Sequence, residues 1–370
     1  MAERTEMMRR RTFITRVGGF GLGALIQPGV PDFAAPATPI RPLQSIGSPV
    51  LDSLLPVIEN SHDVRTHVDK IVEHAGWMAY EELPFPDFIL PFGLGENVDQ
   101  SIDFAMAANC INFAFTDFRT HIKFASEYAG RTWSDSDGMF AAIKRALDEG
   151  IPFLDGKYLA QVTRKDLEHV FRGNIEMPML DERVEIFHSV GNVLEARYKG
   201  RFHHFVESCS PRLYDNGRGI IDKLVKEFPR FNDVSAYEGR EIKFYKLAQL
   251  SVWVNYQFLR RSTRFPIEDL AHMTAFADYI VPVALRVMGM ISYSPSLEKA
   301  IGNYQLIPRD STQEIEIRAH CLYATALLRE EVNKRRPADR QVIIPQIDAR
   351  LWTHFHTTHW PHHLTRTIMY

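Results

Sequence analysis

The feature that most constrains the fold is a long helical pattern from Glu241 to Arg260, EIKFYKLAQLSVWVNYQFLR. Apolar residues occupy most of its circumference, and a helix of this kind has to be buried on nearly every side. The rest of the chain must therefore supply the elements that surround it. Lys246 lies inside this apolar stretch, and its helical face continues with Gln249, Leu250 and Trp253.

A second stretch places one carboxylate among apolar and aromatic residues. Residues 275–282 read AFADYIVP, and Asp278 is the only charged residue among them. An ionised carboxylate is unstable in a dry core unless it is capped, paired or put to use. Pro282 suits the first turn of a helix over residues 283–288, so Asp278 can cap a helix start, where amides and the dipole favour an anion. It can equally be the partner of Lys246, and both interpretations stay open at this point.

The other recognisable elements are almost all helical. Hydrophobic periodicity, capping residues and terminal glycines predict helices over residues 137–149, 179–199 and 219–227. They also predict a helix that begins after Ser61 and ends before Gly76, one from Thr163 to near Gly173, and one that begins at Ser311. Residues 341–344 are the best strand candidate, and the aromatic run 109–118 can be a strand or a buried helix. We predict a mostly α-helical protein with at most a minor short sheet. Its one domain covers residues 46–370 and can divide into two lobes that meet near Lys246 and Asp278.

Composition and charge narrow the function classes. The net charge is −3 with both signs interspersed, which argues against a protein that coats nucleic acid. Cys110, Cys209 and Cys321 are an odd number without CxxC spacing, so neither a disulfide framework nor a thiolate zinc site is expected. We predict a reducing, cytoplasmic location without contact to a membrane.

The first 45 residues are predicted to be a leader and linker ahead of the folded domain. Arg10 and Arg11, followed by Phe13 and Ile14, resemble a twin-arginine export signal, and the apolar run over 17–26 is too short to span a bilayer. Export is therefore the alternative to a cytoplasmic location. The stretch is equally compatible with a disordered basic tail, or with a start codon assigned upstream of a cytosolic protein.

Several stretches carry a resemblance to a known family. FYKLAQL (residues 244–250) and FADYIVP (276–282) resemble signature segments of the queuosine salvage family, the queuosine 5′-phosphate N-glycosylase/hydrolases. Further similar pieces are KRALDEGIP (144–152), DERVEIFHSVGNVL (181–194), EFPRFNDVSAYEGR (227–240), QEIEIRAHCLYA (313–324) and IDARLW (347–352). The resemblance runs from about Val64 to Tyr370.

This resemblance implies a fold, a reaction and its partners. The fold would be helical and related to the DNA-glycosylase superfamily. The reaction would be hydrolysis of queuosine 5′-monophosphate to release queuine, a 7-deazaguanine base used in tRNA modification. Water would be the second substrate, with no metal or other cofactor and no direct contact to nucleic acid. The resemblance does not indicate which residues hold the 5′-phosphate or how many copies assemble.

The resemblance also assigns roles to residues. Cleavage of an N-glycosidic bond passes through an oxocarbenium-like sugar, which a carboxylate beside the anomeric carbon stabilises. Asp278 is expected there, as base, nucleophile or cation stabiliser. Lys246 is expected to orient Asp278, to contact the sugar or phosphate, or to form only a structural ion pair. Phe276 is expected to stack on the base and Tyr279 to bind the substrate. Asp348 is expected to accept from the guanine-like N–H groups or to meet queuine's amine, and its alternative is a surface position on a helix.

Two positions depart from the family pattern. Some relatives carry a His after the Gly-Trp segment where this chain has Glu81, and an Asp after Leu-Trp where it has Thr353. Glu81 is still predicted to bind the substrate, and the departures concern contacts to the base or its side arm more than the reaction class. They leave open a hydrolase of the same fold for another modified nucleotide. A nucleic-acid-binding or DNA-repair protein, and a ligand-binding protein without turnover, are further alternatives.

A group of histidines offers a metal site as another alternative. The set comprises His354, His356, His359, His362 and His363, with His203 and His204 elsewhere. The sequence has no HExxH motif, and Pro361 interrupts the group. Clustered histidines without carboxylate or cysteine partners are weak support for a metal, so no metal is predicted.

Overall fold

The computed structural model describes residues 33, 39–86, 97–260, 262–356, 358 and 360–370. The predicted export signal and its alternatives fall on residues 1–37 and lie, apart from Phe33, outside the described residues, as does His359. In the part that is described, no helix combines the length and the apolar composition needed to cross a membrane.

Helices make up most of the regular structure. The α-helices are α1 (Pro49–Asp52), α2 (Leu55–Asn60), α3 (Val68–Met78), α4 (Val98–Asn109), α5 (Asp135–Asp148), α6 (Gly156–Leu159), α7 (Arg164–Val170), α8 (Leu180–Arg197), α9 (Phe202–Glu207), α10 (Ile220–Glu227), α11 (Lys246–Leu259), α12 (Ile280–Val287), α13 (Pro295–Gly302), α14 (Thr312–Asn333) and α15 (Ile344–Phe355). Short 3₁₀ helices are η1 (Pro229–Phe231), η2 (Leu270–His272) and η3 (Ala338–Arg340).

The strands are short and form separate antiparallel pairs. The pairs are β1 (Val64–Thr66) with β6 (Ile291–Tyr293), β2 (Ala125–Tyr128) with β3 (Arg131–Ser134), and β4 (Val234–Tyr237) with β5 (Arg240–Lys243). The prediction of a mostly α-helical protein with only minor sheet is confirmed over the described residues. Its expected relation to the DNA glycosylases stays a prediction.

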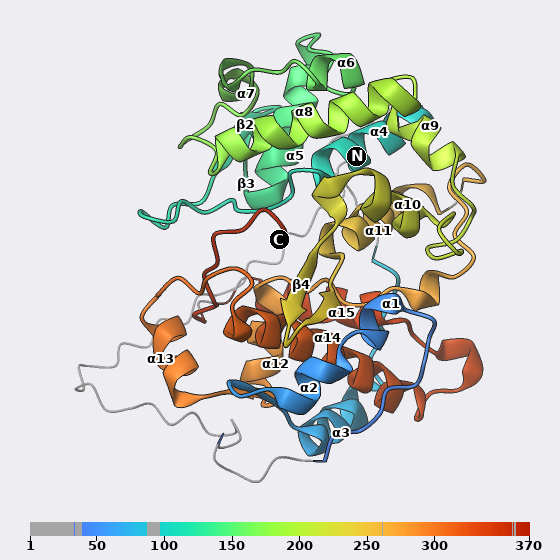
Figure 1. The fold of residues 1–370 in the computed structure, drawn as a ribbon, viewed down its shortest axis with the longest axis vertical. Coiled ribbons are helices and arrows are strands. Elements are labelled where there is room, and N and C mark those ends of the chain that lie inside the picture. The colour runs from blue at the N-terminus through green and yellow to red at the C-terminus, as the bar shows by residue number, and fades with distance from the viewer. Residues whose placement is uncertain (1–32, 34–38, 87–96, 261, 357, 359) are drawn as a thin grey trace, which may run out of the picture.

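The elements form two groups with α11 between them (Figure 1). Helices α4 to α9 lie in the upper group, and α1 to α3 together with α12 to α15 lie in the lower one. The middle level holds α10, α11 and β4, and the chain returns to this level at its last described residue, Tyr370. Side chains from both groups can therefore meet around α11.

Helix α11 is the buried helix that the sequence predicts, and it packs against α4 and α10. Its predicted start at Glu241 is wrong, because residues 240–243 form β5 and pair with β4. Between strand and helix, Tyr245 adopts the left-handed conformation with a φ of 49°. This sharp turn puts Lys246 at the first position of α11.

Helix α14 is the core of the lower group and packs against α2, α3, α12 and α15. Ser311 caps it as predicted, because the Ser311 hydroxyl accepts a hydrogen bond from Glu314 N at 3.3 Å. The helix is buried along most of its length although it carries charged residues, among them Glu316 and Arg318. Charges in such a helix are tolerated only when fixed partners satisfy them.

One of these buried charges explains why the predicted helix from Ser61 is wrong. The Glu316 carboxylate accepts hydrogen bonds from the backbone amides of His62, Asp63 and Val64 at 2.7–3.0 Å. Those amides are held in an extended segment, and β1 then pairs with β6. The helix that follows, α3, therefore begins only at Val68.

Two further local predictions are wrong. Residues 341–344 form no strand, because Val342 N donates to the Asn333 side chain at 2.9 Å and α15 begins directly afterwards. The aromatic run 109–118 is neither a strand nor a helix, since α4 ends at Asn109 and the chain continues without regular structure.

The remaining predicted helices are confirmed with small shifts at their ends. Helices α5, α8 and α10 correspond to the predicted 137–149, 179–199 and 219–227. The predicted capping box at Thr163 is present with Asp166 at the start of α7, although α7 ends at Val170 rather than near Gly173. Local caps and periodicity were sufficient for these elements.

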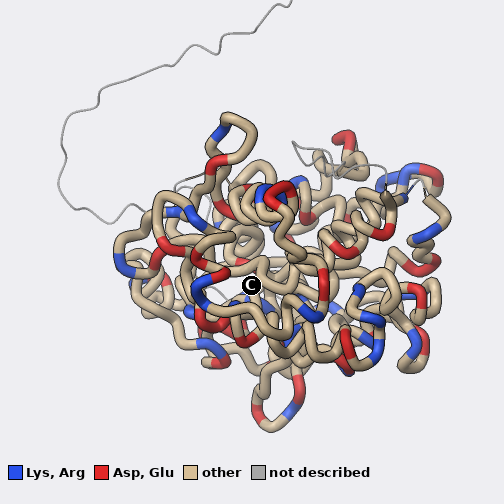
Figure 2. Tube along the Cα trace, turned by 90° about the horizontal axis from the view of Figure 1, so that it is seen from above, with Lys and Arg blue, Asp and Glu red and all other residues tan. Residues whose placement is uncertain are grey.

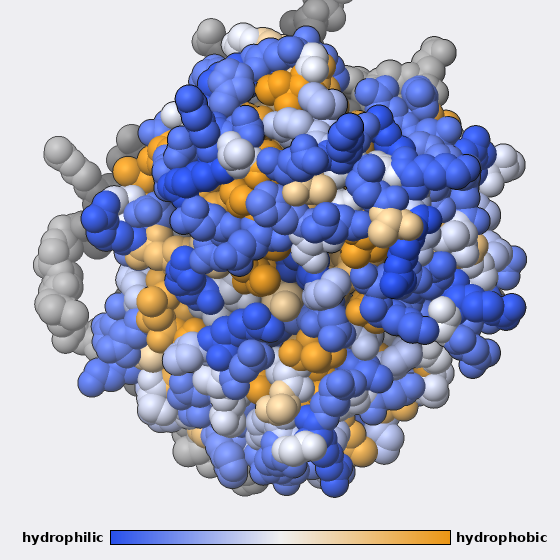
Figure 3. All heavy atoms as spheres, turned by 45° about the horizontal axis from the view of Figure 1, so that its top comes forward, coloured by the Kyte–Doolittle hydropathy of each residue, from blue (hydrophilic) through white to orange (hydrophobic). Residues whose placement is uncertain are grey.

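The surface is mixed in charge and polarity. Basic and acidic residues alternate along the described chain in Figure 2, which shows no continuous basic stripe among those residues. On the face shown in Figure 3, hydrophobic residues form separate patches among hydrophilic ones. Isolated hydrophobic patches of this kind are common on protein surfaces and need no partner to explain them.

Candidate active site

A cavity of about 320 Å³ lies where the two groups of elements meet α11. The upper group contributes residues 112–115 and the start of α5, and the lower group contributes the start of α12 and one face of α15. The volume is in the range of sites for small ligands, about 300–1,000 Å³. Its aromatic lining residues are Phe113, Phe115, Phe140, Trp253, Phe276, Tyr279, Trp352 and Tyr370.

Lys246 reaches this cavity from the first position of α11. The residue is only 6% exposed, and no other described residue forms a hydrogen bond or an ion pair with its ammonium group. Burial lowers the pKa of Lys246 to about 8, although the negative charges of Asp278 and Asp348 act in the opposite direction. Lys246 is therefore a buried donor that is free to bind a ligand.

Asp278 lines the same cavity just ahead of α12. Its Oδ1 accepts hydrogen bonds from Ile280 N at 2.8 Å and Val281 N at 3.2 Å, so the predicted contact with a helix start is present. Oδ2 has no hydrogen-bond donor among the described residues. Burial raises the pKa of Asp278, while the Lys246 charge and the two amides oppose that rise. The contact with the helix start is therefore confirmed, whereas no direct ion pair joins Asp278 to Lys246 among the described residues, and the Lys246 charge acts on Asp278 only through space.

Asp348 faces the cavity from α15 and is 4% exposed, so the surface alternative is wrong. Its Oδ2 accepts a hydrogen bond from Phe276 N at 2.9 Å. Burial, reinforced by the negative charge of Asp278, raises the pKa of Asp348 well above its usual range. Asp278, Asp348 and Lys246 therefore form one coupled group in which the charge of each depends on the others.

Aromatic rings form the walls around these charges. Phe276 lies 6.5 Å from Trp253, measured between ring centroids, and both line the cavity. Tyr279 stacks on His362 at 4.5 Å, and Trp352 stacks on His356 at 4.3 Å. Such faces suit a flat ligand.

The structure does not bring every predicted residue into the cavity. Lys246, Phe276, Asp278, Tyr279 and Asp348 line it together, and so does Thr353. Glu81 does not line it, because the Glu81 carboxylate binds the Arg350 guanidinium through two contacts of 3.0 Å. The ion pair with Arg350 therefore explains where the Glu81 side chain lies, and contact with the cavity does not.

Sequence reasoning missed the wall formed by residues 112–115. Arg183 of α8 is fully buried and donates to the backbone carbonyls of Pro178, Ile111, Phe113 and Ala114. These contacts hold an irregular segment in one shape beside the cavity. The aromatic run 109–118 was a signal that the segment is buried, but nothing in the sequence pairs it with Arg183.

The predicted histidine group is dispersed in the structure. His356 lines the cavity, His362 stacks on Tyr279, and His363 is buried against Tyr370. His203 lies elsewhere and binds the Asp103 carboxylate at 3.0 Å. Among the described residues, no three His, Cys, Asp or Glu side chains lie close enough together to hold a metal ion.

Fold and cavity together define a class of protein. It is a mostly α-helical protein with a cavity whose lining of aromatic rings, two carboxyl groups and an ammonium group suits a small, flat, polar ligand. The chain belongs to the queuosine salvage protein family, whose model matches residues 94–370. This confirms the resemblance seen in the sequence.

Several relatives share most of their length with this chain. The queuosine 5′-phosphate N-glycosylase/hydrolase of Sphaerobacter thermophilus is 31% identical over 87% of this chain and 97% of its own. The mouse protein of the same name is 27% identical, over 85% and 96% respectively. That of Schizosaccharomyces pombe is 30% identical, over 68% and 74%.

Proposed function

We propose that this protein is an N-glycosyl hydrolase that releases queuine from queuosine 5′-monophosphate. The observation that carries the proposal is the Asp278 carboxylate in an aromatic-lined cavity, where two helix amides bind its Oδ1 and its Oδ2 has no hydrogen-bond donor among the described residues. The names of the relatives agree with this reaction.

In the proposed reaction, the bond between the anomeric carbon and the base nitrogen breaks, and its electron pair goes to the base. Water supplies a hydroxyl to the anomeric carbon and a proton to the base nitrogen. Asp278 stabilises the positive charge that develops on the sugar, and it also orients the water or takes its proton. The Lys246 charge and the α12 amides favour the ionised carboxylate that this role needs.

The base is proposed to stack on Phe276 beside Trp253, with its polar edge at Asp348. Queuine is a 7-deazaguanine, so it lacks the ring nitrogen that purine hydrolases can protonate to help the base depart. The enzyme must therefore rely more on the sugar cation and on hydrogen bonds to the base edge. Asp278 and Asp348 line the same cavity, as these two tasks require.

A chromatographic time course with the full chain tests the proposal. Queuosine 5′-monophosphate, unphosphorylated queuosine and guanosine 5′-monophosphate are incubated with wild type and Asp278→Asn, and free base is measured. We expect queuine from the monophosphate, slowed at least about 100-fold by the substitution, because a charge beside the reacting carbon is lost. Asp269→Asn is the matched control, since Asp269 is a buried carboxylate that binds the Leu213 and Tyr214 amides away from the cavity. Release from none of the nucleotides contradicts the proposal.

A hydrolase for another modified nucleotide is the second candidate, and Thr353 favours it. Thr353 lines the cavity at one of the two positions where the sequence departs from the pattern that the resemblance implies. A neutral side chain there can accept a base with a different side arm. Faster release from a different 7-deazaguanine nucleotide in the same time course would establish this candidate.

A cytoplasmic location and action on free nucleotides complete the proposal. The cysteines Cys110, Cys209 and Cys321 are unpaired, which suits a reducing compartment. The mixed charges of Figure 2 suit a small ligand better than a duplex. Fractionation of cells that express the full chain with a C-terminal tag tests the location, and recovery outside the cytoplasm would indicate export.

A further inference from the structure

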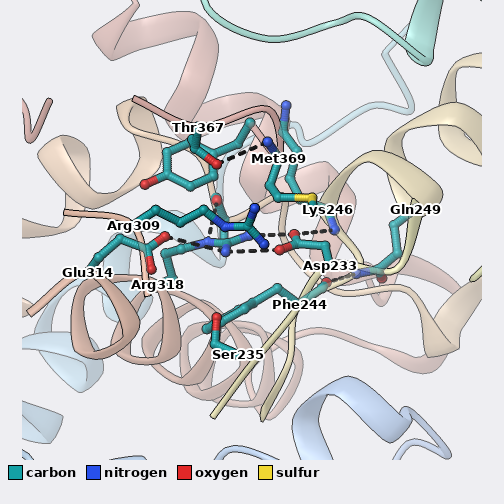
Figure 4. Close-up of polar contacts among 12 residues, drawn as sticks. Asp233, Ser235, Phe244, Lys246, Gln249, Arg309, Glu314, Arg318, Thr367 and Met369 are labelled. Carbon is teal, nitrogen blue, oxygen red and sulfur yellow. Dashed lines mark hydrogen bonds and ion pairs between the residues drawn. The ribbon is translucent and has the colours of Figure 1, made fainter. Parts of the chain in front are cut away.

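A buried charge cluster lies behind the cavity and does not line it. The Asp233 carboxylate follows η1, and the Arg318 guanidinium comes from α14. Arg318 Nη1 donates to Asp233 Oδ1 at 3.1 Å, and Arg318 Nη2 donates to Asp233 Oδ2 at 2.5 Å (Figure 4). Their side chains are 2–3% exposed. A planar, two-contact pair of this kind fixes orientation as well as distance.

Asp233 extends this pair to Lys246. Its Oδ2 accepts a hydrogen bond from Lys246 N at 3.2 Å. Its backbone carbonyl accepts from Phe244 N at 3.0 Å and Tyr245 N at 3.1 Å. Asp233 therefore holds the left-handed turn at Tyr245 and the first residue of α11, from which the Lys246 side chain enters the cavity.

Arg318 extends the pair to Asp278. Its Nε donates to the Ala277 carbonyl at 3.3 Å, and Ala277 shares a peptide bond with Asp278. The guanidinium lies over the Phe244 ring at 3.9 Å and over the Tyr370 ring at 4.6 Å. Both rings prevent it from rotating away, so Arg318 holds the backbone that carries the carboxylate.

We propose that Asp233 and Arg318 are positioning residues that jointly set the separation of Lys246 and Asp278. The inference rests on the proposed function. Each residue binds the backbone next to one reacting group and binds the other residue through two contacts. Misplacement of a reacting group by about 1 Å can cost about 100-fold in rate, so loss of either contact acts on the chemical step.

Two conservative substitutions test the proposal in the full chain. Asp233→Asn keeps the shape but loses the charge that Arg318 binds, and Arg318→Lys keeps the charge but loses the planar fork. Asp269→Asn is the matched control for the first. Glu316→Gln is the control for the second, because Glu316 lies on the same helix and binds only the amides of residues 62–64 and the Tyr237 hydroxyl.

We expect kcat per folded molecule to fall about 10- to 100-fold in Asp233→Asn and Arg318→Lys, with KM changed at most about threefold, because the base-binding walls stay in place. The controls should lose stability without this change in kcat. Wild-type kcat in both test variants, or an equal loss in the controls, overturns the proposal.

Hydrogen exchange provides a readout that needs no substrate. In both test variants, residues 244–250 and 276–280 should exchange faster together, whereas in the controls they should not. Unchanged exchange of either segment overturns the proposal. If wild type releases no base at all, the proposed function fails, and the exchange result still decides whether the pair positions the two segments.

Discussion

Replacing Lys246 by Met should make the protein more stable and nearly inactive. A pKa of about 8 instead of 10.5 means that the folded protein binds the lysine proton less well than the unfolded chain does. At about 1.4 kcal/mol for each tenfold difference, the charge costs roughly 3 kcal/mol below pH 8. Methionine has a similar volume and removes this cost. The gain is an upper limit, since Asp278 and Asp348 lose their counter-charge and then take up protons.

Urea unfolding at pH 7 measures this change in the free energy of unfolding. Between pH 8 and 10.5 the unfolded chain binds more protons than the folded protein, so the free energy of unfolding of wild type rises with pH. The difference in this free energy between Lys246→Met and wild type should therefore shrink over the same range. Base release should fall at least about 100-fold, because Asp278 loses the charge that keeps it ionised. Leu247→Met, at the next buried position, is the control and should change stability by less than about 1.5 kcal/mol. A destabilised Lys246→Met variant that keeps its kcat would refute this reasoning.

Three further outcomes follow from other parts of the structure. Burial lowers the pKa of His320 to about 3, so neutral His320 contributes fully to stability above pH 6.5. About 2 kcal/mol of this contribution is lost by pH 5, and the urea unfolding midpoint of His320→Gln should therefore fall less than that of wild type over the same pH range. Arg183→Met should cost at least about 3 kcal/mol in the same assay, because several buried carbonyls lose their donor, and a neutral effect would contradict the assigned contacts. Glu81→Gln should leave kcat and KM within about twofold and cost at most about 1 kcal/mol, because Glu81 only pairs with a partly exposed Arg350; a large rise in KM would return Glu81 to the substrate.

Local sequence signals were sufficient wherever the cause is local. The caps at Thr163 and Ser311 and the apolar circumference of α11 depend on residues within one or two turns, and all three are confirmed. Strands β1 and β6 were missed because they are distant in sequence, whereas β2–β3 and β4–β5 are short local hairpins that the helical periodicity did not reveal. Val64 is extended because Glu316 holds its amide and Tyr293 pairs with it, and periodicity cannot report on either.

The same distinction applies to the cavity. Lys246, Asp278 and Asp348 could be named from the family resemblance, and a lone charge in an apolar stretch supports the first two. The position of Glu81 after Gly-Trp does not show that Arg350, two residues beyond Asp348, would bind its carboxylate and keep it out of the cavity lining. The role of Arg183 could not be predicted, because its partners are backbone carbonyls, which residues of every type carry.

The ionisable groups in and behind the cavity have to be considered together, because the charge of each affects the others. Lys246, Arg230 and Arg318 are three buried basic groups, and Asp278, Asp348, Asp233 and Glu314 are four buried carboxyl groups, so full ionisation would leave one negative charge in excess. Burial raises the pKa of Asp278, Asp348 and Glu314, and one proton among these three carboxyl groups would balance the group. Of the two carboxyl groups in the cavity, Asp278 has more partners that favour ionisation, because its Oδ1 accepts from two amides and the Lys246 charge acts on it. Asp348 accepts from one amide and lies near the negative charge of Asp278, so we expect a bound ligand to change the protonation of Asp348 more readily than that of Asp278.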